Sequence, residues 1–180
     1  MQPTFIGREA PLDFLSERLH RACDGEGGAV LVLGEAGMGK SALLEELGRS
    51  RREDATVRSA WGRAWEAGGA PPFWPWTQAL RALERSGWSP PDTLSPILAS
   101  DPTERGSLPP GEARFVLLEA VTQALCEHAA RQPTLIFLDD LHAADPSTMA
   151  VLEIVALGMK SILAGTLATL LTGAVIGLVL

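Results

Sequence analysis

The sequence predicts an α/β fold built on a parallel β-sheet, and three features carry this prediction. Two short apolar runs, at residues 29–33 and 134–138, have the length and composition of strands that are buried on both faces. A glycine-rich turn and a helical pattern follow the first run, and two aspartates follow the second. This alternation of strands and helices is the order of a right-handed parallel sheet with flanking helices.

Length and composition limit the classes of protein that fit. The chain has 180 residues, 46% of them hydrophobic, which suits one ordinary globular domain. A net charge of −7 disfavours electrostatic binding of nucleic acid, so we expect no direct nucleic-acid contact from this segment. Cys23 and Cys126 form neither a disulfide framework nor a zinc motif. Together with an N-terminus that does not resemble a secretory signal, this predicts a cytoplasmic protein.

Hydrophobic periodicity predicts the helices. Residues 12–22 are amphipathic, a helix is expected from about residue 40 to 48, and helical spacing returns at 113–130. A weaker β-like segment covers residues 56–60. Asp145 followed by Pro146 is the pattern of a helix N-cap with proline at the first helical position.

The middle of the chain, about residues 61–110, is predicted to be an irregular insertion rich in proline and tryptophan. Nine of the 13 prolines lie between Pro71 and Pro110. We expect one helix here, near residues 76–86, and an exposed loop around 101–110. The tryptophans either contact a partner protein or fill the core; they are Trp61, Trp65, Trp74 and Trp76.

The turn after the first strand carries the strongest functional signal. Residues 34–41 read Gly-Glu-Ala-Gly-Met-Gly-Lys-Ser and match the phosphate-loop (P-loop) pattern G-x-x-x-x-G-K-[ST] between a predicted strand and helix. Glycines let backbone amides turn toward phosphate oxygens, and the helix adds its positive N-terminal end. Lys40 would supply a charge near the β and γ phosphates, and Ser41 a hydroxyl for Mg²⁺. A loop that merely joins strand to helix seldom carries the Lys-Ser pair as well.

We therefore predict the fold of a P-loop NTPase, and a nucleotide site in this turn. The residues expected to contact the nucleotide there are Gly34, Glu35, Ala36, Gly37, Met38, Gly39, Lys40, Ser41 and Ala42.

The aspartates after the second strand are the predicted partners of the P-loop. Asp139 stands at the carboxyl end of that strand and is predicted to act with Ser41 in binding Mg²⁺. Asp140 is predicted to orient or deprotonate the attacking water, which with Lys40 completes the expected catalytic residues. Carboxylates in such a position also cap turns and helices, and capping is the expected role of Asp145.

Three segments together resemble the AAA-type ATPase domain of the STAND class, which occurs in LuxR-type regulators and bacterial adenylate cyclases. They are residues 5–9 (Phe-Ile-Gly-Arg-Glu), the P-loop, and residues 138–147; residues 62–76 also look like that family, so the similarity covers about residues 3–155. The resemblance implies an ATP-driven switch: ADP-bound at rest, ATP-bound on assembly, and reset by slow hydrolysis. It also implies self-association or a regulatory protein partner, and a place in signalling or transcription regulation.

The same resemblance places residues 5–9 near the adenine, with Ile6 and Gly7 as contacts. The alternative is an N-terminal strand or a helix staple. The family also has a later strand between the P-loop strand and the Asp139 strand, and no such strand is recognisable in the sequence. The domain therefore looks incomplete, and ATP hydrolysis is left open.

The last 20 residues, 161–180, contain no charged side chain. As a helix they would reach about 30 Å, the thickness of a bilayer core, with small residues at every fourth position. We therefore expect residues 1–157 to form the ATPase domain and 158–180 an apolar transmembrane helix that anchors it to the inner membrane. A buried helix, or a strand-turn-strand within the sheet, is the alternative.

The tail also weakly resembles the last membrane helix of concentrative nucleoside transporters. This suggests a second hypothesis for the whole chain: a membrane-anchored or fused polypeptide whose P-loop is vestigial. The first hypothesis, an ATP- and Mg²⁺-binding switch module, is the one that we follow.

Overall fold

A four-stranded parallel sheet lies at the centre of the computed structural model, which describes residues 7–50, 56–67, 69–99, 112–163 and 174–179. The strands are β1 (Gly28–Val32), β2 (Arg58–Arg63), β3 (Thr134–Asp139) and β4 (Ala174–Val179), in the spatial order β1-β4-β3-β2. All three pairings are parallel. The predicted parallel α/β sheet is thereby confirmed, and its carboxyl edge is where parallel folds place their ligands.

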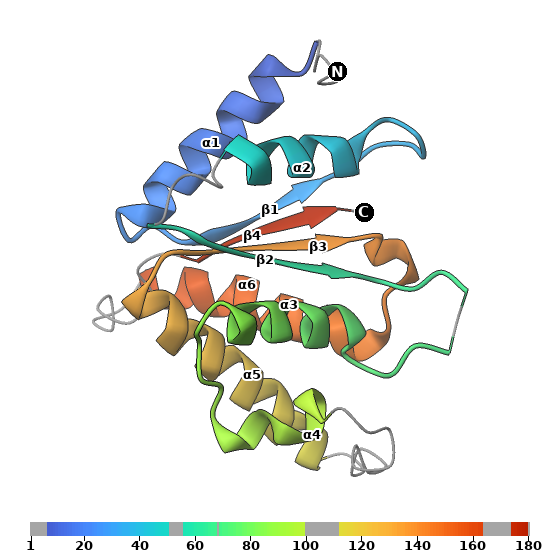
Figure 1. Ribbon diagram of the computed structural model, residues 1–180, viewed down its shortest axis with the longest axis vertical. Coiled ribbons are helices and arrows are strands. Elements are labelled where there is room, and N and C mark those ends of the chain that lie inside the picture. Colours follow the sequence, from blue (N-terminus) through green and yellow to red (C-terminus); the bar gives the residue numbers. More distant parts are fainter. Residues whose placement is uncertain (1–6, 51–55, 68, 100–111, 164–173, 180) are drawn as a thin grey trace.

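Helices cover both faces of this sheet (Figure 1). One layer holds α1 (Glu9–Cys23) and α2 (Lys40–Ser50). The other holds α3 (Trp74–Arg85), α5 (Glu112–Arg131) and α6 (Pro146–Leu163). The other described helical elements are short: η1 (Asp92–Leu94), α4 (Ser95–Leu98) and η2 (Leu141–Ala143). The two layers bury β3 completely, as its uninterrupted apolar sequence requires.

Each layer has its own hydrophobic core. On one face, Leu19 of α1 and Leu44 of α2 pack toward Phe137 of β3. On the other, Trp76 and Leu80 of α3 are fully buried in a larger cluster that includes residues of α5 and α6. Alternate residues of β3 therefore serve the two cores in turn.

The tryptophan-rich segment is mainly structural. Trp76 is fully buried, and its indole Nε1 donates a hydrogen bond to the carbonyl of Thr148 at 3.0 Å. Trp61 stacks on Phe137 with ring centroids 4.2 Å apart, whereas Trp65 is 58% exposed. The predicted helix near 76–86 is present as α3, and η1 and α4 add further turns. The predicted loop at 101–110 lies outside the described residues.

Residue Asp145 has the capping role expected from the sequence. Its Oδ1 accepts hydrogen bonds from the amides of Ser147 (2.9 Å) and Thr148 (3.1 Å) at the start of α6. Its Oδ2 accepts the amide of Phe73 at 3.2 Å, just before α3. One carboxylate thus caps α6 and ties it to the beginning of α3.

The predicted C-terminal apolar helix is wrong over residues 174–179, because these form β4 in the middle of the sheet. The helix α6 runs past residue 157 and ends at Leu163. Among the described residues no helix is long and apolar enough to cross a membrane. The physical reason for the error is that a strand flanked on both sides by other strands, and covered on both faces, is as free of charge as a membrane segment.

The strand β1 also differs from expectation, because one of its faces is exposed and the other is only partly buried. Val30 and Val32 pack against the α1–α2 core, while Leu31 is 45% exposed. β1 is an edge strand of the described sheet. An apolar run of this length therefore did not guarantee burial on both faces.

Candidate nucleotide site

The P-loop connects the carboxyl end of β1 to α2, in the context that its motif requires. Gly37 and Gly39 have φ angles of +78° and +75°, which side chains other than glycine rarely adopt. Such alternation of left-handed and ordinary residues turns successive amides toward a common point and builds a concave site for anions. The loop is therefore shaped to hold a phosphate group.

The ammonium of Lys40 lies across this loop. Its Nζ donates hydrogen bonds to the carbonyl oxygens of Gly34 (2.7 Å) and Glu35 (3.1 Å). These bonds hold the two ends of the turn together and keep the charge beside the site. A phosphate oxygen is a stronger acceptor than a carbonyl, because it is ionised. The lysine side chain is thus placed to exchange its carbonyl partners for phosphate.

The predicted magnesium pair is joined directly. The hydroxyl of Ser41 donates to Asp139 Oδ1 at 3.1 Å, across a separation of 98 residues. Asp139 is completely buried at the end of β3, and its Oδ1 also accepts the amide of Asp140 at 3.0 Å. A hydroxyl and a carboxylate at this distance fit a small, hard cation that prefers oxygen ligands, such as Mg²⁺.

A residue that the sequence did not single out completes this arrangement. Arg63, the last residue of β2, donates to Asp139 Oδ2 from Nη2 (2.6 Å) and from Nε (3.1 Å). Its Nε also lies 3.5 Å from Asp140 Oδ2. The hydrogen bonds to Asp139, followed by the charges of Asp139 and Asp140, raise the pKa of the Arg63 guanidinium. The buried carboxylate of Asp139 is thus neutralised by a cation that is itself half exposed.

The pocket in front of the P-loop has a volume of about 590 Å³, within the usual range for small-molecule sites. It is lined by Gly34, Ala36, Gly37, Gly39, Lys40, Ser41, Glu66, Asp140 and His142. Asp139 lies beneath it and reaches it through Ser41. Of the predicted contacts, Glu35, Met38 and Ala42 do not line the pocket, although Glu35 contributes the carbonyl that holds Lys40.

Asp140 lies at the rim of this pocket in an unusual conformation. Its φ and ψ angles of 56° and 37° are left-handed, which costs free energy for a residue with a side chain. Its carboxylate, Glu66 Oε1 and His142 Nε2 gather at the rim, and the Glu66–His142 distance is 3.1 Å. The sequence had drawn attention to Asp140 but gave no signal for Glu66, because nothing local links residue 66 to residue 142.

Arg8, just before α1, lies next to the P-loop. Ile6 lies outside the described residues. Gly7 has a φ of +82°, and the next residue, Arg8, places its guanidinium 3.6 Å from where a Cβ of Gly39 would lie. The segment expected near the adenine therefore adjoins the P-loop.

The sheet, the phosphate loop and the acidic strand end define a P-loop nucleotide-binding domain. The sequence matches the AAA ATPase domain family over residues 4–171, and the chain belongs to that family. No curated protein matches the sequence. Among solved structures, the chain is similar to the ORC2 protein of Aeropyrum pernix, whose structure was solved as ADPNP-ADP complexes.

That likeness concerns the fold. The TM-score is 0.54 at 17% sequence identity, and the match covers 98% of this chain but 42% of the other. The chain thus spans less than half the length of that protein. The family match reaches residue 171, beyond the point near residue 155 where the resemblance seen in the sequence ended.

Proposed function

We propose that this domain binds ATP together with Mg²⁺ in the 590 Å³ pocket and acts as a nucleotide-controlled switch of the STAND type. The observation that carries the proposal is the hydrogen bond between Ser41 and Asp139, which joins the P-loop to the acidic strand end at 3.1 Å. A P-loop without its partner carboxylate would bind phosphate with no place for the cation. In this domain the P-loop serine and its partner carboxylate are in hydrogen-bond contact.

Different residues would contact different parts of the nucleotide. Amides of the 34–39 turn donate to the phosphate oxygens, and Lys40 turns from the carbonyls of Gly34 and Glu35 toward the β and γ phosphates. Ile6 and Gly7 are the proposed contacts of the adenine. The turn and Lys40 follow the carboxyl end of β1, so the phosphate contacts do not need large movements of the sheet.

Magnesium would be held by the Ser41 hydroxyl and the Asp139 carboxylate. The ion neutralises charge on the β and γ phosphates when it is bound. Arg63 pairs with the carboxylate of Asp139 and fixes its direction through two hydrogen bonds. Oδ1, the oxygen that faces Ser41, is then the one presented to the cation.

Asp140 is our proposed general base for slow hydrolysis. Of the two aspartates at the carboxyl end of β3, it is the one that lines the pocket, so its carboxylate has access to a water beside the γ phosphate. Hydrolysis would return the domain to its resting, ADP-bound state. The ATP-bound form would self-associate or bind a regulatory protein, as the resemblance to STAND regulators of signalling and transcription suggests.

The second hypothesis, a membrane-anchored polypeptide with a vestigial P-loop, is not favoured. No described helix could span a membrane, and residues 174–179 belong to the sheet. The P-loop also retains its lysine, its serine and its carboxylate partner in contact.

Calorimetry with ATP tests the proposal. Lys40→Ala should weaken Mg·ATP binding at least about tenfold, since a charged hydrogen bond contributes roughly 1.5–3 kcal/mol. The matched control is Arg49→Ala, which removes a cation from the exposed end of the same helix. Asp139→Asn should remove the gain in affinity that Mg²⁺ provides while leaving Mg-free binding nearly unchanged. Unchanged Mg·ATP affinity in both site variants would refute the proposal.

The hydrolytic step has its own test. Asp140→Asn should lower the rate of phosphate release about 100-fold or more if the carboxylate acts as a base, with ATP affinity retained. A variant with full turnover would assign the step to another group.

A further inference from the structure

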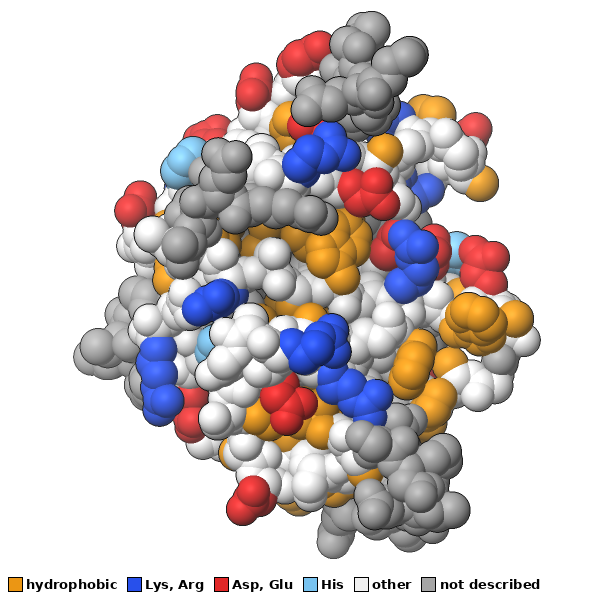
Figure 2. Space-filling model, in the orientation of Figure 1, with side chains coloured by type: hydrophobic (Ala, Val, Ile, Leu, Met, Phe, Trp, Pro, Cys, Tyr) orange, Lys and Arg blue, Asp and Glu red, His pale blue; other side chains and the backbone are white. Residues whose placement is uncertain are grey.

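A second pocket lies at the opposite edge of the sheet from the P-loop. Its volume is about 560 Å³, and it is formed where β2 and β3 begin and α5 ends. Arg58 of β2, Arg131 at the end of α5 and His128 one turn earlier line it, together with Trp88. On the face shown in Figure 2, basic side chains (blue) gather around a histidine (pale blue) in this region.

The two arginines of this pocket form no ion pair within the part of the chain that the structure describes. Arg58 is held instead by a neutral partner, since its Nε donates to Gln132 Oε1 at 3.0 Å. Its terminal amino groups are directed by this bond but not neutralised. Two guanidinium groups that border one pocket without a carboxylate create a local excess of positive charge.

His128 is the least expected member of the group. Its side chain is only 9% exposed, and its Nε2 is shut off from solvent with no hydrogen-bond partner among the described residues. Trp88 packs over the imidazole at a centroid distance of 5.3 Å. A buried polar atom without a partner costs free energy, and such atoms are rare in native proteins. Burial lowers the pKa of His128, and the charges of Arg58 and Arg131 lower it further.

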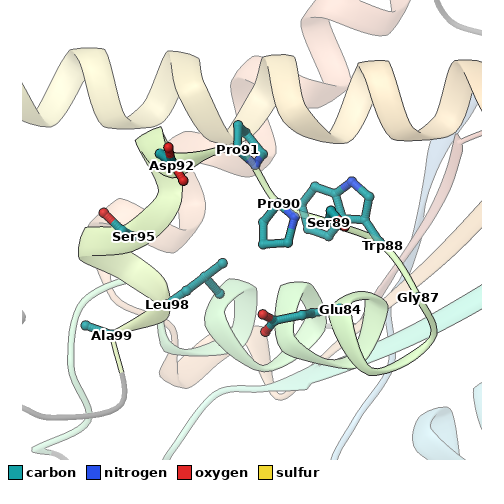
Figure 3. Close-up of a pocket in the computed structure, with 10 residues that line it drawn as sticks. All are labelled: Glu84, Gly87, Trp88, Ser89, Pro90, Pro91, Asp92, Ser95, Leu98 and Ala99. Carbon is teal, nitrogen blue, oxygen red and sulfur yellow. The ribbon is translucent and has the colours of Figure 1, made fainter.

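A neighbouring pocket provides a comparison. It lies on the other side of the turn that carries Trp88 and has a volume of about 720 Å³ (Figure 3). Glu84 and Asp92 contribute carboxylates to its lining, and none of the described residues that line it is basic. An anion would be repelled there and attracted to the pocket of His128. Charge, rather than volume, therefore distinguishes the two.

We propose that the pocket formed by Arg58, His128 and Arg131 is a binding site for a small-molecule oxyanion, a phosphate or a carboxylate group. The guanidinium groups of Arg58 and Arg131 supply charge-assisted hydrogen bonds, and the His128 ring lines the same pocket beside them. The ligand enters at the amino edge of the sheet, so it does not compete with a nucleotide at the carboxyl edge. The site is independent of the proposed nucleotide function.

Nuclear magnetic resonance of the three histidines tests this proposal directly, because His20, His128 and His142 are the whole set. The full chain is saturated with Mg·ADP and titrated with inorganic phosphate and, separately, with acetate. We expect the His128 ring signals to shift with a saturable curve while those of His20 remain in place. Tighter binding of phosphate would assign the site to phosphorylated ligands, and tighter binding of acetate to carboxylates.

Substitutions of the two arginines then test whether these side chains bind the anion. Arg58→Gln and Arg131→Gln should each weaken binding about tenfold, the effect of losing one charged hydrogen bond. Arg18→Gln on α1 removes the same charge from the other face of the sheet and should leave the affinity unchanged. Lys40→Ala should also leave the His128 response intact, which separates this site from the P-loop.

Two results would overturn the proposal. One is a His128 signal that neither anion moves. The other is a response that persists with full affinity in both arginine variants, or that disappears with Lys40→Ala. Because Arg131 is exposed, its variant keeps the test valid even where replacement of the buried His128 would disturb folding.

Discussion

Replacing Arg63 with alanine should destabilise the folded domain by about 1–2 kcal/mol. The side chain donates two hydrogen bonds to Asp139, a carboxylate with 0% exposure, so the variant leaves a buried charge with fewer partners. Charged hydrogen bonds contribute roughly 1.5–3 kcal/mol, and we reduce this because the arginine itself is 55% exposed and screened by solvent. The Ser41 hydroxyl and the Asp140 amide still bind the carboxylate, which limits the loss.

Urea unfolding followed by tryptophan fluorescence measures this change. With a slope of about 2 kcal/mol per molar, in the middle of the usual range, the midpoint should fall by about 0.5–1 M. The matched control is Arg58→Ala at the other end of the same strand, whose hydrogen-bond partner is the neutral Gln132. This control should lose about 0.5 kcal/mol or less.

A double-mutant cycle with Asp139→Asn identifies the source of the effect. If the carboxylate is what Arg63 stabilises, the arginine replacement should cost much less in the Asp139→Asn background. Saturating Mg·ATP should also reduce its cost, because the bound cation then compensates the same charge. An Arg63→Ala midpoint equal to that of the wild type, or a cost that is the same in both backgrounds, would refute the reasoning.

Three further predictions concern the parts of the fold that support the site. Gly62→Ala should cost about 3 kcal/mol or more, because the new Cβ would lie 2.0 Å from the carbonyl oxygen of Pro75. Gly69→Ala has open space but a φ of +78°, so it should lose only about 1–2 kcal/mol, and equal urea midpoints for the two variants would contradict the prediction. Asp145→Ala should lower the free energy of unfolding by about 1–2 kcal/mol, because it removes the cap of α6, while Asp145→Asn should retain most of the stability. Equal thermal unfolding midpoints for the two variants would contradict the capping role. His128, whose pKa is lowered in the folded state, takes up its proton more readily when unfolded, so stability should decline as the pH falls below the ordinary histidine value of about 6.5. His128→Gln should reduce that decline in unfolding measurements between about pH 7 and 5, by at most about 1.4 kcal/mol per pH unit, and an unchanged slope would exclude this residue.

Features encoded in one continuous stretch of sequence were predictable. The P-loop depends on residues 34–41, and the acidic strand end on residues 134–140, so each could be recognised alone. Their contact followed from the general rule that parallel strands present their carboxyl ends at one edge. The structure places Ser41 and Asp139 in hydrogen-bond contact, as that rule requires.

The contributions of Arg63 and Glu66 could not be predicted in this way. Arg63 reaches Asp139 because β2 pairs with β3 in a register that sets Arg63 opposite Asp139. No local pattern states which strand lies next to which, or in what register. Glu66 meets His142 for the same reason, since the segment after β2 follows the end of β3.

The sequence of the tail led to a wrong prediction for residues 174–179, because hydrophobicity alone does not distinguish a membrane helix from a central strand of a sheet. Residues 161–180 carry no charge, and length alone favoured a membrane helix. A central strand needs a similarly apolar sequence, and the structure uses residues 174–179 as one. The sheet position between the P-loop strand and the Asp139 strand, for which no strand was recognisable in the sequence, is occupied in the structure by these residues of the tail.

The position of β4 has a consequence for how the molecule is made. β1 and β3 do not pair with each other; each pairs with a strand contributed by residues 174–179. A nascent chain that has emerged only as far as α6 contains both the P-loop and the acidic strand end. It lacks β4, the strand that lies between β1 and β3 and sets the spacing between them. During synthesis, the two halves of the phosphate site should therefore reach their native spacing only once residues 174–179 have emerged and paired with both β1 and β3.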